Sequence, residues 1–239
     1  MKKYGRVPVD ETKRLRQWRK WWETKGKDKK LPILQECPVQ RPRQSVKLAE
    51  FIGIMLGDGG MSKYQATITL HHIDDLAFSK HVVSLIQQLF NITPRVYHYP
   101  KSSVNDITIS RIGIVRYLHE LGLAVGSKVA QQVDMPSWVK KDSRYAIACL
   151  RGLVDTDGSV FTHNYSVKGK RYSYKKLIFT SRSQPLQLSV AKLLINFGIN
   201  ARISGFDVCV DSRESMRKYF DLIGSHNPKH LKRYTSKVG

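Results

Sequence analysis

Cysteine is scarce in this sequence, with three widely separated copies at Cys37, Cys149 and Cys209. The absence of any Cys-x-x-Cys pair argues against a disulfide framework and a cysteine zinc site, and it indicates a reducing compartment. No apolar run approaches the ~20 residues of a transmembrane helix. The basic first residues are not followed by the apolar stretch of a secretory signal. We therefore expect an intracellular protein with no membrane partner.

Acidic residues are few relative to basic ones. The 239 residues include 19 Asp and Glu against 41 Lys and Arg, a formal net charge of +22. Such an excess of one sign repels itself unless an anion lies nearby, so nucleic acid is the expected partner. A soluble enzyme with a basic surface and a protein bound to anionic membranes are the alternatives.

The charge is densest at the N-terminus, where residues 1–47 hold 15 of the basic residues and only 5 of the acidic ones. We assign residues 1–45 to a basic N-terminal extension. Within it, residues 11–30 have helical periodicity, with Leu15, Trp18 and Trp22 on one stripe and Asp10 as the expected N-cap. The helix is either docked by its tryptophans or laid along a phosphate backbone as a basic arm, and both interpretations stay open.

The rest of the chain contains an internal repeat, predicted to span residues 46–143 and 144–239. Strand-like "ATITLHH" resembles "KLIFTSR", and strand-like "DITISR" resembles "DVCVDSR". Helical stretches flank these strands in the same order in both halves. Each half therefore reads helix, strand, strand, helix, strand, strand, helix. We predict an α+β fold of two αββαββα repeats related by a pseudo-twofold axis, equivalent to a fused symmetric dimer.

Each repeat begins with an apolar helix that ends on an aspartate, in "FIGIMLGDG" and "LRGLVDTDG". A carboxylate is unfavourable at a helix C-terminus, by up to ~1 kcal/mol. Gly53 and Gly57 lie four residues apart in the first copy, as Gly152 and Thr156 do in the second. Small residues at this spacing let two helix backbones approach closely.

If the two helices pack on each other, Asp58 and Asp157 lie side by side and repel unless cations lie between them. Carboxylates and helix-end carbonyls are ligands that Mg²⁺ prefers, so the predicted metal ligands are Asp58, Asp157, Gly57 and Thr156. Gly59 or Gly60 is expected to end the first helix in a left-handed conformation. A single Asp-Gly is usually only a turn, but two matched copies favour a site. The EF-hand pattern fails, because it needs glycine where Val160 stands.

These nonapeptides resemble the two motif copies of the LAGLIDADG homing endonucleases, and the resemblance covers residues 46–239. It implies a single-chain, two-repeat member with a saddle of two antiparallel sheets and both motif helices at the pseudo-dyad. In that family the acid at the eighth position binds metal, which corresponds here to Asp58 and Asp157. The first copy departs from the motif at the sixth position, where Leu56 stands, whereas the second copy keeps Asp155.

The resemblance implies a site-specific double-strand DNA endonuclease that uses Mg²⁺ or Mn²⁺ and cuts across the minor groove to leave short 3′ overhangs. Two matching lysines, Lys128 and Lys229, follow the motif acids at similar distances and are predicted to steady charge at the phosphate. Gln65 and Lys176 are further candidates for positioning water. The alternative for Lys128 and Lys229 is that they are ordinary surface lysines.

A two-stranded β-ribbon fits the DNA major groove, so strand residues that point away from the core are predicted to contact DNA. In the first repeat these are Lys63, Gln65, Thr67, Thr69, Arg95, Tyr97, Lys101, Asn105, Thr108 and Arg111. In the second repeat they are His163, Tyr165, Lys168, Lys170, Arg171, Tyr172, Tyr174, Lys175, Arg182, Arg202 and Arg213. The histidines His71, His72, His81 and His98 have no metal-ligand spacing and are assigned to the surface or the groove.

Three functions remain open at this point. The leading hypothesis is a monomeric homing endonuclease that binds a long, roughly pseudo-palindromic DNA target. The others are an intron maturase that binds RNA and a DNA-binding protein that does not cleave. An initial Met and the absence of flanking splicing signals favour intron or free-standing coding over an intein. The cytoplasm or nucleoid of a prokaryote is favoured over an organelle.

Overall fold

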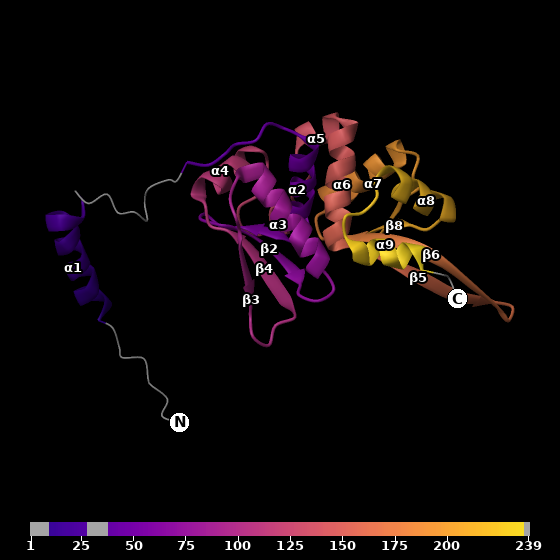
Figure 1. The fold of residues 1–239 in the computed structure, drawn as a ribbon, viewed down its shortest axis with the longest axis horizontal. Coiled ribbons are helices and arrows are strands. Elements are labelled where there is room, and N and C mark those ends of the chain that lie inside the picture. The colour runs from indigo at the N-terminus through magenta and orange to yellow at the C-terminus, as the bar shows by residue number, and fades with distance from the viewer. Residues whose placement is uncertain (1–9, 28–37, 237–239) are drawn as a thin grey trace, which may run out of the picture. The chain divides into compact units, whose positions relative to one another are not determined.

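The computed structural model describes residues 10–27 and 38–236 (Figure 1). The chain divides into two compact units, Met1–Cys37 and Pro38–Gly239. Cys37 and residues 28–36 of the predicted extension lie outside the described residues. Among the residues that are described, no helix is both long enough and apolar enough to span a membrane.

Residues 10–27, the described part of the first unit, form a helix, which confirms the helical prediction for these residues. The α1 helix (Glu11–Trp21) continues into a π-helical turn, η1 (Trp22–Gly26). Asp10 is its N-cap, because its carboxylate accepts a hydrogen bond of 3.0 Å from the backbone N–H of Lys13. A side-chain acceptor at this position satisfies one of the free N–H groups of the first turn. Trp18 stacks on Trp22 with ring centroids 5.7 Å apart.

The second unit contains both predicted repeats, and each has the expected order of elements. The first comprises α2 (Val46–Leu56), β1 (Gly59–Met61), β2 (Ala66–His71), α3 (Leu76–Phe90), β3 (Arg95–His98), β4 (Val104–Ile109) and α4 (Ile112–Glu120). The second comprises α6 (Ser143–Asp157), β5 (Gly158–Val167), β6 (Lys170–Thr180), α7 (Gln184–Asn196), β7 (Arg202–Ser204), β8 (Asp207–Val210) and α8 (Arg213–Leu222). Two short helices, α5 (Ser137–Lys141) and α9 (Pro228–Thr235), were not predicted.

The two repeats form two antiparallel sheets with the same strand order. These orders are β1-β2-β4-β3 and β5-β6-β8-β7. Gly59 pairs with Ile68 in the first sheet as Gly158 pairs with Phe179 in the second. The same threonine–aspartate pair recurs, because Thr69 donates to Asp106 at 2.6 Å and Thr180 donates to Asp207 at 2.7 Å. The predicted α+β fold with two related antiparallel sheets is confirmed.

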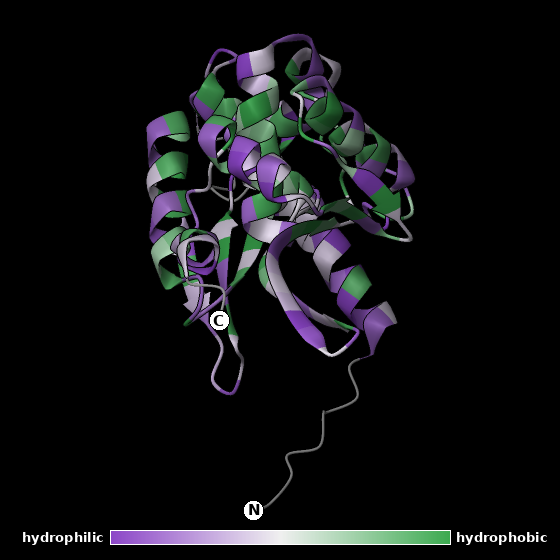
Figure 2. Ribbon diagram, turned by 90° about the vertical axis from the view of Figure 1, so that its right-hand side faces the viewer, coloured by the Kyte–Doolittle hydropathy of each residue, from purple (hydrophilic) through white to green (hydrophobic). Residues whose placement is uncertain are grey.

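Helices cover one face of each sheet and leave the other face open (Figure 1). Strand side chains alternate accordingly, since successive residues point to opposite faces. Ile68 and Leu70 of β2 are buried against the helices, whereas Thr69 between them is exposed. Figure 2 shows the resulting mixture of hydrophobic and hydrophilic residues along the strands and helices. We call the helix-free side of each sheet its open face.

Residues 38–44, the last described part of the predicted extension, pack against the repeats. The hydroxyl of Tyr117 donates to the carbonyl of Pro42, and that of Tyr145 donates to the carbonyl of Gln44 at 3.1 Å. Val39 lies against Gly113, where an added Cβ would be 2.8 Å from a Val39 methyl. This segment is therefore held by contacts with α4 and with the N-terminal end of α6.

The α2 and α6 helices cross at the centre of the second unit with their backbones in contact. A Cβ added to Gly53 would lie 2.2 Å from the carbonyl oxygen of Cys149, and one added to Gly152 would lie 2.4 Å from that of Glu50. Side-chain carbons essentially never come so close to backbone oxygens. The predicted use of small residues for close helix approach is confirmed, and it fixes the positions of both motif aspartates.

Substituting Gly152 by Ala is expected to destabilise the fold by roughly 1–3 kcal/mol, because the added methyl must push α6 away from α2. Gly60→Ala is the matched control, since a Cβ there would meet nothing within 4 Å. Urea unfolding monitored by circular dichroism would measure both variants. Equal stability of Gly152→Ala and wild-type protein would contradict the close packing.

Candidate functional site

The two motif helices end differently from the prediction. The α2 helix stops at Leu56, with Gly57 as its C-cap at φ −77°, so no left-handed residue ends it. Gly59 instead begins β1, and an added Cβ would lie 2.4 Å from the Cα of Met55. Gly158 has the same role after α6, because an added Cβ would be 2.3 Å from the carbonyl oxygen of Val154. These glycines are needed for the sharp return of the chain and not for a positive φ.

Both motif aspartates lie at the adjacent C-terminal ends of α2 and α6. A Cβ on Gly57 would lie 2.0 Å from the Thr156 hydroxyl oxygen and 3.5 Å from a carboxylate oxygen of Asp157. The Asp157 carboxylate therefore lies near Gly57, which directly precedes Asp58, and the charges of the two acids interact. The structure brings the two acids into one site, as the helix-packing argument expected.

Burial disfavours the ionised form of the Asp58 and Asp157 carboxyl groups. It raises the pKa of Asp58 to about 6, opposed by the positive charge of Lys128. Burial also raises the pKa of Asp157 to about 7, and the negative charge of Asp58 adds to that rise. Two carboxylates that share a site disfavour each other's charged form. A cation placed between them would relieve that cost.

Lys128 caps the end of α2 from the loop after α4. Its ammonium donates to the carbonyl oxygen of Leu56 at 2.8 Å and also to that of Gly57. A positive charge is favourable at a helix C-terminus, where free carbonyls concentrate. Desolvation lowers the pKa of Lys128, while the charges of Asp157 and Asp58 raise it. The predicted lysine is thus at the site. Its ammonium donates a hydrogen bond to the carbonyl oxygen of Gly57, which is one of the predicted metal ligands.

Lys229 lies at the corresponding place in the second repeat but has different partners. Its ammonium donates to Asp75 at 2.7 Å, and the amide of Asn227 donates to the same oxygen at 2.8 Å. The positive charge of Lys229 also lowers the pKa of Asp58. Asp75 is a buried acid immediately before α3 that the sequence analysis missed. The Asp74–Asp75 pair was the available signal, but nothing in the sequence connects it with residues 227–229.

The sixth motif position differs between the copies for a structural reason. Asp155 is 1 % exposed, and it accepts a hydrogen bond of 2.8 Å from the backbone N–H of His226 and another from the Ser225 hydroxyl. It therefore anchors the loop before α9. Leu56, in the first copy, instead lines a small cavity with Leu123 and Ala124. Thr156, another predicted ligand, donates its hydroxyl to the Gly152 carbonyl at 2.9 Å.

The open face of the first sheet carries half of the ten DNA-contact residues predicted in that repeat. Strand register places Thr67, Thr69, Arg95, Tyr97 and Thr108 on this face, although Thr108 is only 9 % exposed. Asn105 lies on the other, core-facing side, where it pairs with Leu70 across the strands and binds His98 at 2.9 Å. Its predicted orientation away from the core is wrong, because its place in β4 alternates with Asp106.

The open face of the second sheet carries a cluster of aromatic and basic side chains. Tyr165 stacks on Tyr172 with centroids 5.2 Å apart, and His163 packs edge-on against Tyr174 at 5.3 Å. The ammonium of Lys176 lies 5.1 Å from the Tyr174 ring centroid, a cation–π distance. Lys170 and Arg202 share this face by strand register.

The remaining predicted DNA contacts lie in turns, at strand ends or on the other face. Exposed residues of this kind are Lys63, Gln65, Lys101, Arg111, Lys168, Arg182 and Arg213. Arg171 alternates to the helix-covered side of β6, near the exposed hairpin end. Lys175 has the same orientation, and its ammonium donates to Thr162 at 2.9 Å and to Ser236 at 2.7 Å. Lys175 is therefore engaged within the protein.

Among the four histidines assigned to the surface, His81 has a more specific environment. Its Nε2 lies 2.7 Å from a carboxylate oxygen of Glu50, which is also 2.6 Å from Nδ1 of His226. Glu50 and His226 are 176 residues apart, so sequence spacing contained no signal for this cluster. His71, His72 and His98 gather separately at the end of the first sheet.

The raised pKa values of the two motif acids predict a pH-dependent stability. An unfolded aspartate ionises near pH ~4, so without divalent ions the wild-type free energy of unfolding should fall as pH rises from about 4 to 7. Asp157→Asn cannot ionise, and it should exceed wild type above pH 7 by on the order of 2 kcal/mol. Urea titrations across this range would test it, with exposed Asp221→Asn as control. A wild-type stability that increases over the same interval would refute the assignment.

Comparison with known families adds independent information about the fold. Residues 144–237 match the family model described as the LAGLIDADG-like domain. A curated relative, the replication factor C small subunit of Methanocaldococcus jannaschii, is 23 % identical over 197 residues. That match covers 78 % of this chain but only 10 % of the relative, so the chain corresponds to about a tenth of that protein's length.

Solved structures share the fold at low sequence identity. The homing endonuclease I-DmoI in complex with DNA and calcium matches with a TM-score of 0.52 and 16 % identity, covering 76 % of this chain and 91 % of that one. Related I-DmoI complexes contain manganese or were obtained in the presence of magnesium. The N-terminal LAGLIDADG domain of DUF199/WhiA matches with a TM-score of 0.51 and 18 % identity, covering 77 % and 86 %.

The family model covers the second repeat, and the structural matches extend across most of the second unit. Identities below 25 % establish the fold and leave the activity open. Residues 144–237 thus match the LAGLIDADG-like domain, and the second unit has the two-repeat LAGLIDADG fold that its motifs indicated.

Proposed function

We propose that this protein is a site-specific, divalent-metal-dependent double-strand DNA endonuclease of the homing type. The observation that carries the proposal is the pair Asp58 and Asp157, half-buried together at the ends of two helices in backbone contact. A fold does not need two mutually repelling acids at this point. We therefore infer that the two acids serve to bind a cation, which neutralises their repulsion.

The site's donor set fits hard divalent ions such as Mg²⁺ or Mn²⁺. Asp58 and Asp157 would supply carboxylate oxygens, and the adjacent ends of α2 and α6 would supply carbonyl oxygens. The proposed carbonyls are those of Thr156 and Gly57, and Lys128 would have to leave the Gly57 carbonyl for a metal to bind it. Such all-oxygen sets suit Mg²⁺. When bound, the metal would activate water and neutralise charge at the scissile phosphate.

The lysines at the site would assist through charge. Lys128 acts electrostatically on both motif acids, and Lys229 acts on Asp58. An ammonium in a partly buried position stabilises negative charge that develops on a phosphate oxygen more strongly than it would in water. Because Lys128 is hydrogen-bonded to helix-end carbonyls and Lys229 to Asp75, their contributions to the two strand cuts are expected to be unequal.

The open sheet faces are the proposed DNA-binding surface. They combine basic side chains with the tyrosine and histidine cluster of the second sheet, on a protein of net charge +22. Basic residues contact phosphates and fix register, while side chains in the major groove read base edges. A duplex across both sheets would bring its backbone to the paired aspartates, and one acid per strand fits cleavage across the minor groove with short 3′ overhangs.

Two alternatives remain on the same scaffold: an RNA-binding maturase and a DNA-binding protein that does not cleave. The N-terminal LAGLIDADG domain of DUF199/WhiA shares the fold. A shared fold alone does not decide between a nuclease and a protein that binds nucleic acid without cleaving it. The retained acid pair favours the nuclease. We also propose that the protein is encoded by an intron in a prokaryote. We propose further that it acts as a monomer.

The decisive test is cleavage of DNA that carries the gene's insertion site. With Mg²⁺ the wild-type protein should cut both strands, and with a chelator it should bind without cutting. Asp58→Asn and Asp157→Asn should each reduce double-strand cleavage by at least about 100-fold, because each removes a charged group that acts at the reacting phosphate. Gel assays of cutting and of binding would separate the two effects.

Exposed Asp221→Asn serves as the matched control and should cut like wild type. Full-rate cutting by either motif variant would exclude these acids as the catalytic pair. Binding without cleavage under every metal condition would favour the non-cleaving alternative, and preferential binding of intron RNA would favour the maturase.

The salt dependence of DNA affinity tests the proposed surface. Each phosphate contact contributes about 0.9 to the slope of log affinity against log salt. Arg95→Gln and Lys170→Gln, both on exposed open-face positions, should each reduce that slope by roughly one contact. Lys80→Gln removes the same charge from the helical side and should leave the slope unchanged. Equal effects of all three variants would indicate nonspecific attraction.

A further inference from the structure

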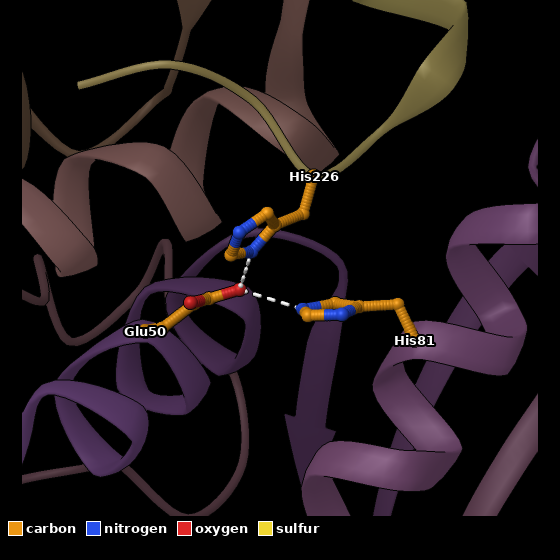
Figure 3. Close-up of side chains that lie close together, drawn as sticks. All are labelled: Glu50, His81 and His226. Carbon is orange, nitrogen blue, oxygen red and sulfur yellow. Dashed lines mark hydrogen bonds and ion pairs between the residues drawn. The ribbon is translucent and has the colours of Figure 1, made fainter. Parts of the chain in front are cut away.

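Glu50, His81 and His226 form a compact cluster away from the paired aspartates (Figure 3). One oxygen of Glu50 lies 2.7 Å from Nε2 of His81 and 2.6 Å from Nδ1 of His226. The three candidate ligand atoms all lie within 4.8 Å of one another. Figure 3 shows both imidazole rings directing a nitrogen at the same carboxylate oxygen.

The three residues come from separate elements that only the folded second unit brings together. Glu50 belongs to α2 and His81 to α3, whereas His226 precedes α9 in the second repeat. The Glu50 side chain is 5 % exposed, but those of His81 and His226 are 32 % and 40 % exposed. The carboxylate thus forms the floor of a site whose imidazoles face solvent, which gives an ion a route of entry.

The surrounding contacts keep these side chains in place. Although burial opposes its charge, hydrogen bonds from His226 and His81 lower the pKa of Glu50 to about 2. Nε of Arg151 lies 3.8 Å from the second Glu50 oxygen. The backbone of His226 is held by Asp155 at 2.8 Å. Such outer contacts are those that orient the ligands of protein metal sites.

We propose that Glu50, His81 and His226 form a second metal site, which binds Zn²⁺ or a similar transition-metal ion and links the two repeats. Two imidazoles and one carboxylate with a solvent-accessible fourth position are a recurrent zinc ligand set. Zinc ligands at ~2.0–2.2 Å from the ion lie roughly 3.3 Å apart in a tetrahedron. The two Glu50–histidine distances, 2.7 and 2.6 Å, would have to increase by roughly 0.6–0.7 Å. The two imidazole nitrogens, which lie within 4.8 Å of each other, would have to adopt the same separation.

This site is chemically distinct from the aspartate pair. Imidazole nitrogens favour zinc, copper or nickel, whereas all-oxygen sites favour magnesium and manganese. Glu50 lies six residues before Leu56, the last residue of α2, which corresponds to about 9 Å along the helix at 1.5 Å per residue. The inference does not depend on the proposed nuclease activity. An ion here would join α2 and α3 of one repeat to the loop before α9 of the other.

Isothermal titration of metal-free, full-length protein with ZnCl₂ tests this inference directly. We expect one high-affinity zinc per chain and at least a tenfold loss of affinity in His81→Ala and in His226→Ala. Binding of Co²⁺ should give visible absorption bands that both variants lose. His98→Ala is the matched control, since it removes an imidazole from the separate histidine group of the first sheet.

Asp58→Asn alters the proposed nuclease site but none of the three proposed zinc ligands, so it should bind zinc like wild type. The zinc result therefore does not depend on whether the protein is a nuclease. Circular dichroism would establish that each variant is folded, and Glu50→Gln would provide a third ligand variant that preserves side-chain volume. Absence of stoichiometric zinc binding to the wild-type protein would overturn the inference. Zinc binding that His98→Ala weakens while His81→Ala and His226→Ala do not would overturn it as well.

Discussion

The backbone contact between α2 and α6 determines the geometry on which the remaining structure depends. Gly53 and Gly152 allow it, because any side chain there would meet a carbonyl oxygen of the opposite helix. This contact aligns the two helix ends and brings together two carboxylates and the carbonyl oxygens of the last helical turns, some of which Lys128 binds. Because packing places the two carboxylates near each other, their charges repel. The proposed cation site would neutralise this repulsion.

The pseudo-twofold symmetry is preserved in the strand order of the sheets and relaxed around the acids. The Thr69–Asp106 and Thr180–Asp207 pairs match almost atom for atom. Beside the acids, Lys128 caps its own helix, whereas Lys229 binds Asp75 of the other repeat. A single chain permits this divergence, because each repeat can change without altering its counterpart. Two sites with unequal surroundings are the natural result.

The sequence could predict those features that depend on local periodicity and on the repeat. Alternation within strands, helix order and the small residues at the helix crossing were all visible along the chain. Asn105 shows the limit, because a one-residue error in strand phase exchanges the two faces. Gly59 shows another, since glycine needed for close approach and glycine needed for positive φ look identical in a sequence.

Interactions between distant residues that belong to no repeated motif could not be predicted from spacing along the sequence. Asp75 meets Lys229, and Glu50 meets His226, only because α3 and the loop before α9 pack beside the crossing helices. Glu50 is the more instructive of the two, since a buried acid inside an apolar helix is costly without partners. Its two imidazole partners come from both repeats, so the charge is stable only in the assembled second unit. The same helix crossing that brings the motif acids together therefore also creates the setting for the histidine cluster.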